Sequence, residues 1–307
     1  MKFTTPINIK PNKTIDHNSR IVMLGSCFAE NIGKKLIECG FNVVMNPMGI
    51  LYNPISIHRA LERIAEGSEF TEDDLFYHNG LWASFMHHGS FSHSDRGEAL
   101  RMMNERLSEG HEQLRNATHL IITFGSAEIY EHNDKIVGNC HKLPSRQFTH
   151  RMLSIDEIRL PYSQSPIYDN QLSTIFTISP VRYLGEGAHH GQINKSTLLL
   201  ATDQICQSMG ADYFPSYEIM MDELRDYRYY ATDMIHPSEM AVDYIFERFA
   251  ETYFTDEAIR TAEEVVKIKK SLSHRPLHPD SEEYEKFKKK LSLQIDAITK
   301  KYPNIKL

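Results

Sequence analysis

Short runs of apolar residues alternate with longer amphipathic stretches along most of the chain. The run at residues 21–24 is continuous, which is typical of a strand buried on both faces of a sheet. The next stretch repeats Phe28, Ile32 and Leu36 at four-residue spacing and predicts an amphipathic helix. Gly40 ends that helix, and residues 41–44 predict a second strand. The pattern therefore indicates a βαβ unit with parallel strands and a right-handed crossover.

Further strands and helices alternate downstream. Apolar runs predict strands at residues 120–124 and 174–178, and a fifth short strand begins at Tyr213. Helices are predicted over about residues 194–209 and 237–253. This alternation predicts a layered α/β fold, in which ligand sites form beyond the carboxyl ends of the strands. Three turns directly follow strands, so we expect them to gather at one edge of the sheet; they are residues 25–27, 125–126 and 179–180.

The last part of the chain differs in character. From Asp256 onward it is rich in Lys and Glu, with a break at residues 274–279. We expect two helices flanking that break, with their charges on a solvated face. The predicted organisation is a domain at residues 1–255 followed by a helical extension at residues 256–307.

Charge and composition narrow the function classes. The chain has 307 residues, of which 41% are hydrophobic, and a formal net charge of −7, which argues against nucleic-acid or anionic-membrane binding. No apolar run reaches the roughly 18 residues that span a bilayer. The first residues lack the apolar core of a signal peptide. The four cysteines follow no disulfide or zinc spacing. We expect a cytoplasmic protein with free thiols and no membrane span.

The first candidate for chemistry is the turn Gly25-Ser26-Cys27, where a buried strand passes into a helix. Unpaired N–H groups at a helix N-terminus favour negative charge and lower the pKa of a thiol, which predicts a reactive Cys27. The alternative is structural: Ser26 caps the helix and Cys27 is a small core residue. Taken alone, the turn favours that alternative.

The second candidate is Asp233 with His236, followed by Pro237. The proline keeps His236 out of helical geometry, so its imidazole can stand at a loop end with Asp233 beside it. A carboxylate on one ring nitrogen orients the imidazole, and the other nitrogen takes a proton from a nucleophile. The alternative is an Asp cap and an incidental surface histidine.

Together, a nucleophile after the first strand and a late Asp-x-x-His-Pro resemble the SGNH (GDSL-type) hydrolase superfamily. The stretch Gly25-Ser26-Cys27-Phe28-Ala29 resembles the GSCFA-domain family, and roughly residues 20–250 are similar to it. Other similar stretches lie at residues 46–54, 123–127, 139–142, 179–182 and 213–236. The resemblance implies a three-layer α/β/α sandwich with a mostly parallel, flavodoxin-like sheet of about five strands.

The resemblance also implies roles for particular residues. Cys27 holds the place of the nucleophilic Ser in the Gly-Asp-Ser-Leu motif, and Ser26 holds the Asp place, so Cys27 is favoured over Ser26 as nucleophile. Asp233 and His236 match the superfamily's last block. Gly49 resembles the glycine whose backbone N–H helps to bind an oxyanion.

The block at residues 125–128 departs from the superfamily pattern. Ala127 stands where the superfamily has an Asn that donates to the oxyanion, and loss of one such donor costs about 100-fold or more in rate. Ser126, Asn139 or a backbone N–H are candidates to replace that donor.

Other candidates are weaker. His141, beside Cys140, is either near the site or a hydrogen-bonded structural residue. Arg182 and Lys195 are candidates to bind an anionic substrate or a CoA phosphate, although surface charge is the simpler explanation for Lys195. The histidines show no zinc spacing, so we expect no metal site and no cofactor; they include His87, His88, His93, His189 and His190.

The resemblance implies acyl transfer through a Cys/Ser-His-Asp site. The expected substrate is an O-acylated carbohydrate or another small ester. One alternative is an O-acyltransferase that uses acyl-CoA, and another is a catalytically degenerate module that binds a glycan or a protein. The sequence specifies no protein partner.

Overall fold

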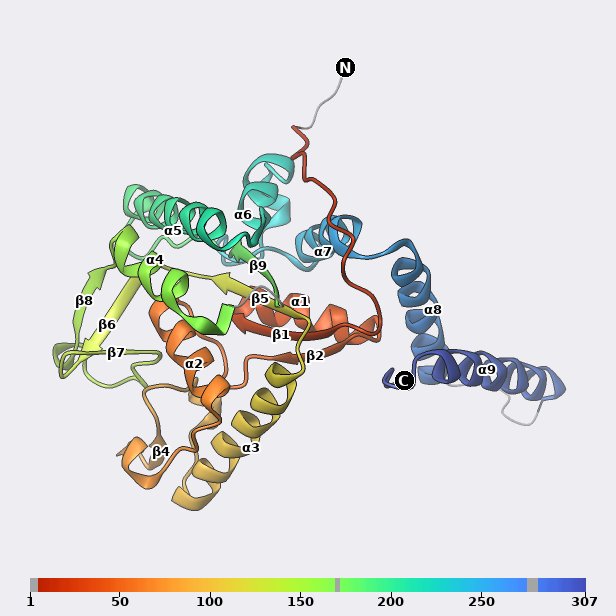
Figure 1. Ribbon diagram of the computed structural model, residues 1–307, viewed down its shortest axis with the longest axis horizontal. Coiled ribbons are helices and arrows are strands. Elements are labelled where there is room, and N and C mark those ends of the chain that lie inside the picture. Colours follow the sequence, from red (N-terminus) through yellow and green to blue (C-terminus); the bar gives the residue numbers. More distant parts are fainter. Residues whose placement is uncertain (1–4, 169–171, 275–280) are drawn as a thin grey trace.

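The structure is a computed structural model that describes residues 5–168, 172–274 and 281–307. Its centre is a five-stranded parallel sheet with the order β10-β9-β5-β1-β2 (Figure 1). Read from β2 and numbered along the chain, this is the flavodoxin-like order. The strands are Arg20–Gly25 (β1), Asn42–Met45 (β2), His119–Phe124 (β5), Ser173–Ile178 (β9) and Asp212–Phe214 (β10). The prediction of all five strands is confirmed.

Helices cover both faces of the sheet, which gives the predicted three layers (Figure 1). One face carries α2, α3, α4 and α5, and the other carries α1 and α7. Helix α5 begins at Ala188, earlier than the predicted start near Asn194. The helices of this part are Cys27–Glu38 (α1), Pro54–Glu66 (α2), Arg96–Arg115 (α3), Ile155–Gln164 (α4), Ala188–Met209 (α5), Ser216–Glu218 (α6) and Glu239–Tyr253 (α7).

The central strands bury side chains on both faces. In β1, Val22 and Leu24 belong to the core beneath α2 to α5, whereas Ile21 and Met23 belong to the core beneath α1 and α7. Successive side chains of a strand point to opposite faces, so a strand covered on both sides needs apolar residues throughout. This is why the run at residues 21–24 shows no alternation.

Two small sheets lie within the excursions between the central strands, and the sequence did not predict them. One is the hairpin of Phe76–His78 (β3) and Leu81–Ala83 (β4). The other has the order β7-β6-β8, with antiparallel strands Glu128–His132 (β6), Lys135–Val137 (β7) and Thr149–Met152 (β8). Their strands have three to five residues, which is too short for a hydrophobic period to mark them.

The helical extension consists of Asp256–Ser273 (α8) and Glu282–Lys301 (α9), as predicted. Ala258 and Ala262 of α8 join the core beneath α7, and α9 packs on α8 through Ile298. Figure 1 shows α9 projecting away from the sheet. Residues 275–279 of the predicted break lie outside the described residues. Across the described ranges, none of the helices has the length and apolarity to cross a membrane.

Candidate active site

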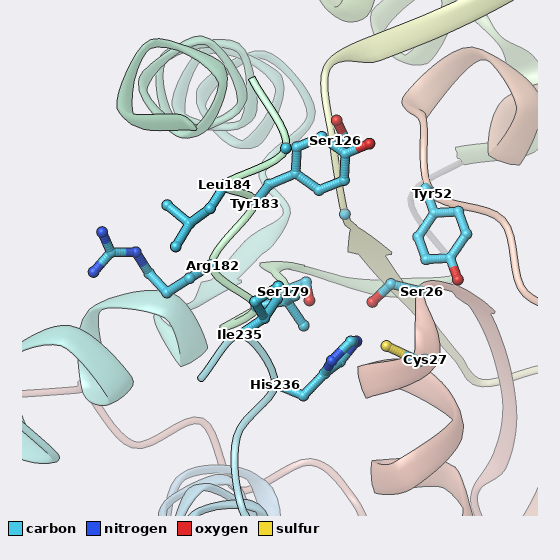
Figure 2. Close-up of a pocket in the computed structure, with 13 residues that line it drawn as sticks. Ser26, Cys27, Tyr52, Ser126, Ser179, Arg182, Tyr183, Leu184, Ile235 and His236 are labelled. Atoms are coloured by element: carbon cyan, nitrogen blue, oxygen red, sulfur yellow. The ribbon is translucent and has the colours of Figure 1, made fainter. Parts of the chain in front are cut away.

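A cavity of about 350 Å³ lies at the carboxyl ends of β1, β5 and β9. Its wall includes Ser26 and Cys27 from the turn after β1, Ser126 after β5, and Ser179 after β9. His236, from the loop before α7, completes the wall (Figure 2). The fold therefore brings together both stretches that the sequence singles out.

The turn after β1 lies close to β5 because residue 25 is a glycine. Gly25 has φ +141°, and a Cβ there would come within 2.2 Å of the Thr123 carbonyl oxygen. Its N–H donates to Asn46 Oδ1 at 2.9 Å. A residue with a side chain would push the turn away from β5. Gly25 thus sets the position of the next two residues at the cavity.

Ser26 and Cys27 differ in their surroundings. Ser26 precedes α1 but makes no capping bond; it is 1% exposed and its hydroxyl has no hydrogen-bond partner. Burial raises the pKa of the Cys27 thiol and outweighs the opposing N–H groups of Phe28 and Cys27. The prediction of a lowered thiol pKa is therefore wrong, because desolvation exceeds the helix N-terminal field. Cys27 needs a base to become a thiolate at neutral pH.

Asp233 holds His236 in one orientation. One carboxylate oxygen accepts the backbone N–H groups of Ile235 and His236, both at 2.9 Å. The other lies 2.7 Å from Nδ1 of His236. The pKa of Asp233 is lowered to about 2, chiefly by the N–H of His236, then by that of Ile235. An ionised carboxylate only accepts hydrogen bonds, so Nδ1 carries the proton and Nε2 has the free lone pair.

The His236 ring faces the turn after β1. Figure 2 shows its edge pointing toward the Cys27 sulfur, with the Ser26 hydroxyl beside them. The loop is held from two sides: the N–H of Ala231 donates to the His236 carbonyl at 2.8 Å, and that of Arg182 donates to the Ile235 carbonyl at 3.0 Å. These bonds fix the backbone that carries the imidazole.

Ser126 is surrounded by hydrogen-bond donors. Its hydroxyl oxygen accepts from Nδ2 of Asn194 at 2.8 Å and from the N–H of Glu128 at 3.0 Å. Asn194 Oδ1 in turn accepts the N–H of Ala127 at 3.0 Å, which fixes the orientation of the amide. A hydroxyl has two acceptor positions and one proton. With both positions occupied, the Ser126 proton is left to donate elsewhere, and its residue lines the cavity.

Lys195 is buried below the cavity. It is 2% exposed, and its Nζ donates to the carbonyl oxygens of Gly125 at 2.9 Å and Ser179 at 2.8 Å. Burial lowers its pKa to about 7, while the nearby Cys27 opposes this. The interpretation of Lys195 as a surface charge is therefore wrong, because α5 turns this side chain into the protein.

We compared the chain with models of known protein families. A model of the GSCFA family matches residues 20–249. The chain belongs to the GSCFA family. A model of the GSCFA domain protein, C-terminal domain, matches residues 265–307, which include α9. No match was found among curated proteins or among solved structures.

Several residues at the cavity of this GSCFA chain received no role from the sequence, and Tyr52 and Ser179 are two of them. The backbone carbonyl of Tyr52 accepts the N–H groups of Gly125 and Ser126 at 2.8 and 3.1 Å, and its ring lines the cavity (Figure 2). Ser179 is 1% exposed and its hydroxyl has no hydrogen-bond partner. Both belong to stretches that resemble the family, and Ser179 also follows a strand, which was the available signal.

Three expected residues lie away from the cavity of this GSCFA protein. The Gly49 N–H already donates to the Asn46 carbonyl at 2.8 Å, so it is not free to bind an oxyanion. Asn139 Oδ1 accepts the N–H of His141 at 2.7 Å, and Nε2 of His141 lies 2.8 Å from the Ser84 carbonyl. None of the three lines the cavity. Hydrogen bonds within local turns use the polar groups of Gly49 and Asn139, and a bond to a distant segment uses that of His141. A linear motif reveals neither kind of bond.

Arg182 lies where the GSCFA cavity meets a second hollow. It lines both, as does Leu184. The second hollow has a volume of about 360 Å³ and is lined largely by apolar residues, including Met220, Met221 and Met234. The Arg182 guanidinium points toward the Met221 sulfur, at 3.8 Å, rather than toward Cys27. Arg182 therefore belongs to the rim of the cavity.

The histidines of the GSCFA chain are engaged in other ways. Within the described ranges, no group of three His, Cys, Asp or Glu side chains is arranged to hold a metal ion. His87 is fully buried between Phe70 and Phe91, and burial lowers its pKa to about 3. His190 contacts the buried carboxylate of Glu128 at 2.5 Å.

Proposed function

We propose that this GSCFA protein is an acyl hydrolase in which Cys27 attacks an ester carbonyl, with His236 as base and Asp233 as its partner. The observation that carries the proposal is the cavity that Cys27 and His236 share. The imidazole is oriented by a carboxylate at 2.7 Å, so its free nitrogen is available to a nucleophile.

The proposed chemistry has two halves. Nε2 of His236 takes the Cys27 proton, and the thiolate forms a bond to the carbonyl carbon. The ester C–O bond breaks, and the leaving alkoxide takes the proton from the imidazolium. In the second half, His236 takes a proton from water, and the resulting hydroxide attacks the thioester. The acid leaves and the Cys27 thiol is restored.

Ser126 is the proposed donor to the oxyanion. Asn194 and Glu128 fill the acceptor positions of its hydroxyl, which leaves the proton for the cavity. The Cys27 N–H, at the start of α1, is the second proposed donor. In this arrangement an Asn from α5 orients a serine, where the superfamily pattern has an Asn that donates directly. Ser126 would thus replace the donor that is lost because Ala127 stands in the place of that Asn.

Small esters and O-acylated carbohydrates are the proposed substrates. A parallel sheet with a nucleophile after its first strand and an Asp-His pair before its last helix resembles the SGNH hydrolases. The cavity of about 350 Å³ suits a short acyl group, and Tyr52 offers a ring at its wall.

A panel of nitrophenyl esters and acetylated sugars tests the proposal. We expect wild type to hydrolyse at least one of them. Cys27→Ala and His236→Ala are each expected to lower kcat/KM by about 100-fold or more. Ser126→Ala is expected to lower it by about 100-fold with a small change in KM. Cys140→Ala and His141→Ala are matched controls outside the cavity and are expected to retain activity.

Three outcomes would contradict this scheme in whole or in part. Full activity in His236→Ala would show that His236 is not the general base. Loss in Ser26→Ala with activity retained in Cys27→Ala makes Ser26 the nucleophile. If no ester turns over while an acylated glycan still binds, the chain is a binding module instead of an enzyme.

The hollow beside Arg182 favours a second candidate, an acyltransferase that uses an acyl-CoA donor. Its apolar wall suits an acyl or pantetheine chain, and Arg182 at the junction suits an anionic group. An acyltransferase would release CoA only when an alcohol acceptor is added. CoA release in water alone, at the same rate, would identify a hydrolase.

A further inference from the structure

Lys195 is an unusual residue to find in a protein interior. It is 2% exposed, and in the described parts of the chain no carboxylate is paired with it. Its Nζ contacts two backbone carbonyls and the ring of Tyr217, whose centroid lies 5.4 Å away. Lysine is seldom fully buried without a counter-charge, because desolvation is costly. A cation kept in such a place calls for a functional reason.

The position of Lys195 relates it to the cavity. Its two carbonyl partners belong to Gly125, directly after β5, and Ser179, directly after β9. Both residues also line the cavity. The ammonium therefore joins two strand ends below the place where Cys27 and His236 meet. Cys27 and Lys195 also act on each other electrostatically, each favouring the charged form of the other.

We propose that Lys195 is a positioning residue whose buried positive charge stabilises the Cys27 thiolate while its hydrogen bonds hold the ends of β5 and β9 together. No covalent step involves Lys195. The proton of Cys27 passes to His236, and the negative charge left on sulfur is balanced by the ammonium behind the cavity wall. The inference rests on the proposed function in taking Cys27 as the reactive thiol.

Other charged or titratable groups also surround this thiol. Glu30 of α1 opposes the thiolate, and the Tyr52 hydroxyl stands across the cavity. His236 faces it from the loop before α7. Lys195 is the group on α5 that favours the thiolate. Removing its charge should therefore raise the pKa of Cys27, while the opposing groups remain in place.

The test measures alkylation of each cysteine by iodoacetamide in the intact chain, as a function of pH, by peptide mass spectrometry. Lys195→Met has a similar length and no charge. We expect the Cys27 rate at pH 7 to fall about tenfold, which corresponds to about 1.4 kcal/mol, and its pH profile to move upward. The rate at Cys39 should not change.

The chain provides a matched control at the other end of α1. Lys269 acts on Cys39 as Lys195 acts on Cys27, and donates to the Ile37 carbonyl at 2.8 Å. Lys269→Met should slow alkylation of Cys39 and leave Cys27 unchanged. This reciprocal pattern separates a local charge effect from a general loosening of the structure.

Lys195→Gln separates the charge from the tether and serves if Lys195→Met does not fold. Its amide can still donate to a carbonyl but carries no charge, so we expect the same loss of Cys27 reactivity. An unchanged Cys27 profile in a folded Lys195→Met or Lys195→Gln protein would overturn the proposal. Alkylation needs no ester, so its result stands apart from that of the hydrolysis panel.

Discussion

The two ends of α1 each combine a cysteine with a nearby lysine, yet they differ in what surrounds them. Cys27 begins the helix and lines a cavity that it shares with His236. Cys39 follows the last turn, where α8 packs against the helix and Lys269 donates to the Ile37 carbonyl. Burial raises the pKa of both thiols, to about 11 at Cys39.

The comparison shows that neither burial nor a nearby cation identifies a nucleophile. What distinguishes Cys27 is an adjoining cavity and an imidazole whose second nitrogen is held by a carboxylate. A thiol that is protonated at rest can attack only if a base stands within reach. At the other end of α1, Cys39 has packing contacts with α8 in place of a cavity and an imidazole. We therefore assign that end a structural role.

The largest expected effect comes from Asp233→Asn. This change removes the carboxylate that orients His236, and the oriented imidazole is what distinguishes the Cys27 end of α1 from the Cys39 end. The amide oxygen can still accept the N–H groups of Ile235 and His236, but its charge is lost. We expect kcat on the best ester to fall by about 100- to 10,000-fold, because the imidazole loses its tautomer and its counter-charge. Steady-state kinetics at neutral pH provide the measurement.

Asp16→Asn is the matched control for that variant. Asp16 also caps a neighbouring N–H, that of Asn18 at 2.9 Å, but lies outside the cavity. Its activity should equal that of wild type. Equal activity of Asp233→Asn and wild type would show that the Asp-His pair does not take part in the reaction.

A smaller effect is expected at the structural end of α1. Gly40 has φ +88°, and a Cβ there would lie 3.1 Å from Val265 of α8 and 3.3 Å from Ile305. Gly40→Ala should lower the free energy of unfolding by roughly 1–2 kcal/mol, because an L-residue is strained in this conformation. Urea denaturation measures the loss. Ester hydrolysis should be unchanged, and a large drop in kcat would show that the two ends are coupled.

Lys195 should also make the stability of the protein depend on pH. Its pKa is about 7 in the folded protein against 10.5 for a free side chain. Between these values the unfolded chain binds more protons, so stability should rise with pH from 7 to about 10. Urea denaturation at pH 6, 8 and 10 should show this rise in wild type, relative to Lys195→Met. A constant difference between the two proteins would contradict a buried, titrating lysine.

Much of the fold follows from the hydrophobic pattern. Continuous apolar runs mark the central strands β1, β5 and β9, because a strand covered on both faces cannot alternate. The edge strands β2 and β10 are partly buried and are marked by shorter runs. The small sheets of β3, β4 and β6 to β8 were not predicted, since strands of three to five residues are too short to show a hydrophobic period. Helix α5 was predicted too short because its first turns, from Ala188, hold histidines and glycine in place of apolar residues.

Lys195 lies within the predicted helix, and it was misread because a lysine on a helix is usually assigned to the solvated face. The buried stripe of α5 runs through Leu198, Ala201 and Ile205, and steps of three and four residues back from Leu198 reach Lys195 and Asn194. Both are buried and both fasten the end of β5. Extending the buried stripe toward the N-terminus of α5 would have predicted that Asn194 and Lys195 are buried.

Other parts of the site could not be read from the sequence. Gly49 and Asn139 have the residue types that the chemistry needs, but hydrogen bonds within their own turns use those groups. The backbone path of a turn decides which of its polar groups form hydrogen bonds within the turn, and the sequence does not specify that path. Gly25, by contrast, was identified because a glycine between a strand and a helix has few alternative explanations.

Half of the surface of each side chain in the Asp233–His236 pair, 48% in both cases, is open to solvent. In the proposed reaction, a thioester formed on Cys27 would therefore meet bulk water at the face where the imidazole stands. Its lifetime would be short unless an acceptor molecule itself covers that face. In the proposed reaction, product choice would thus depend on how well the incoming alcohol shields the ring.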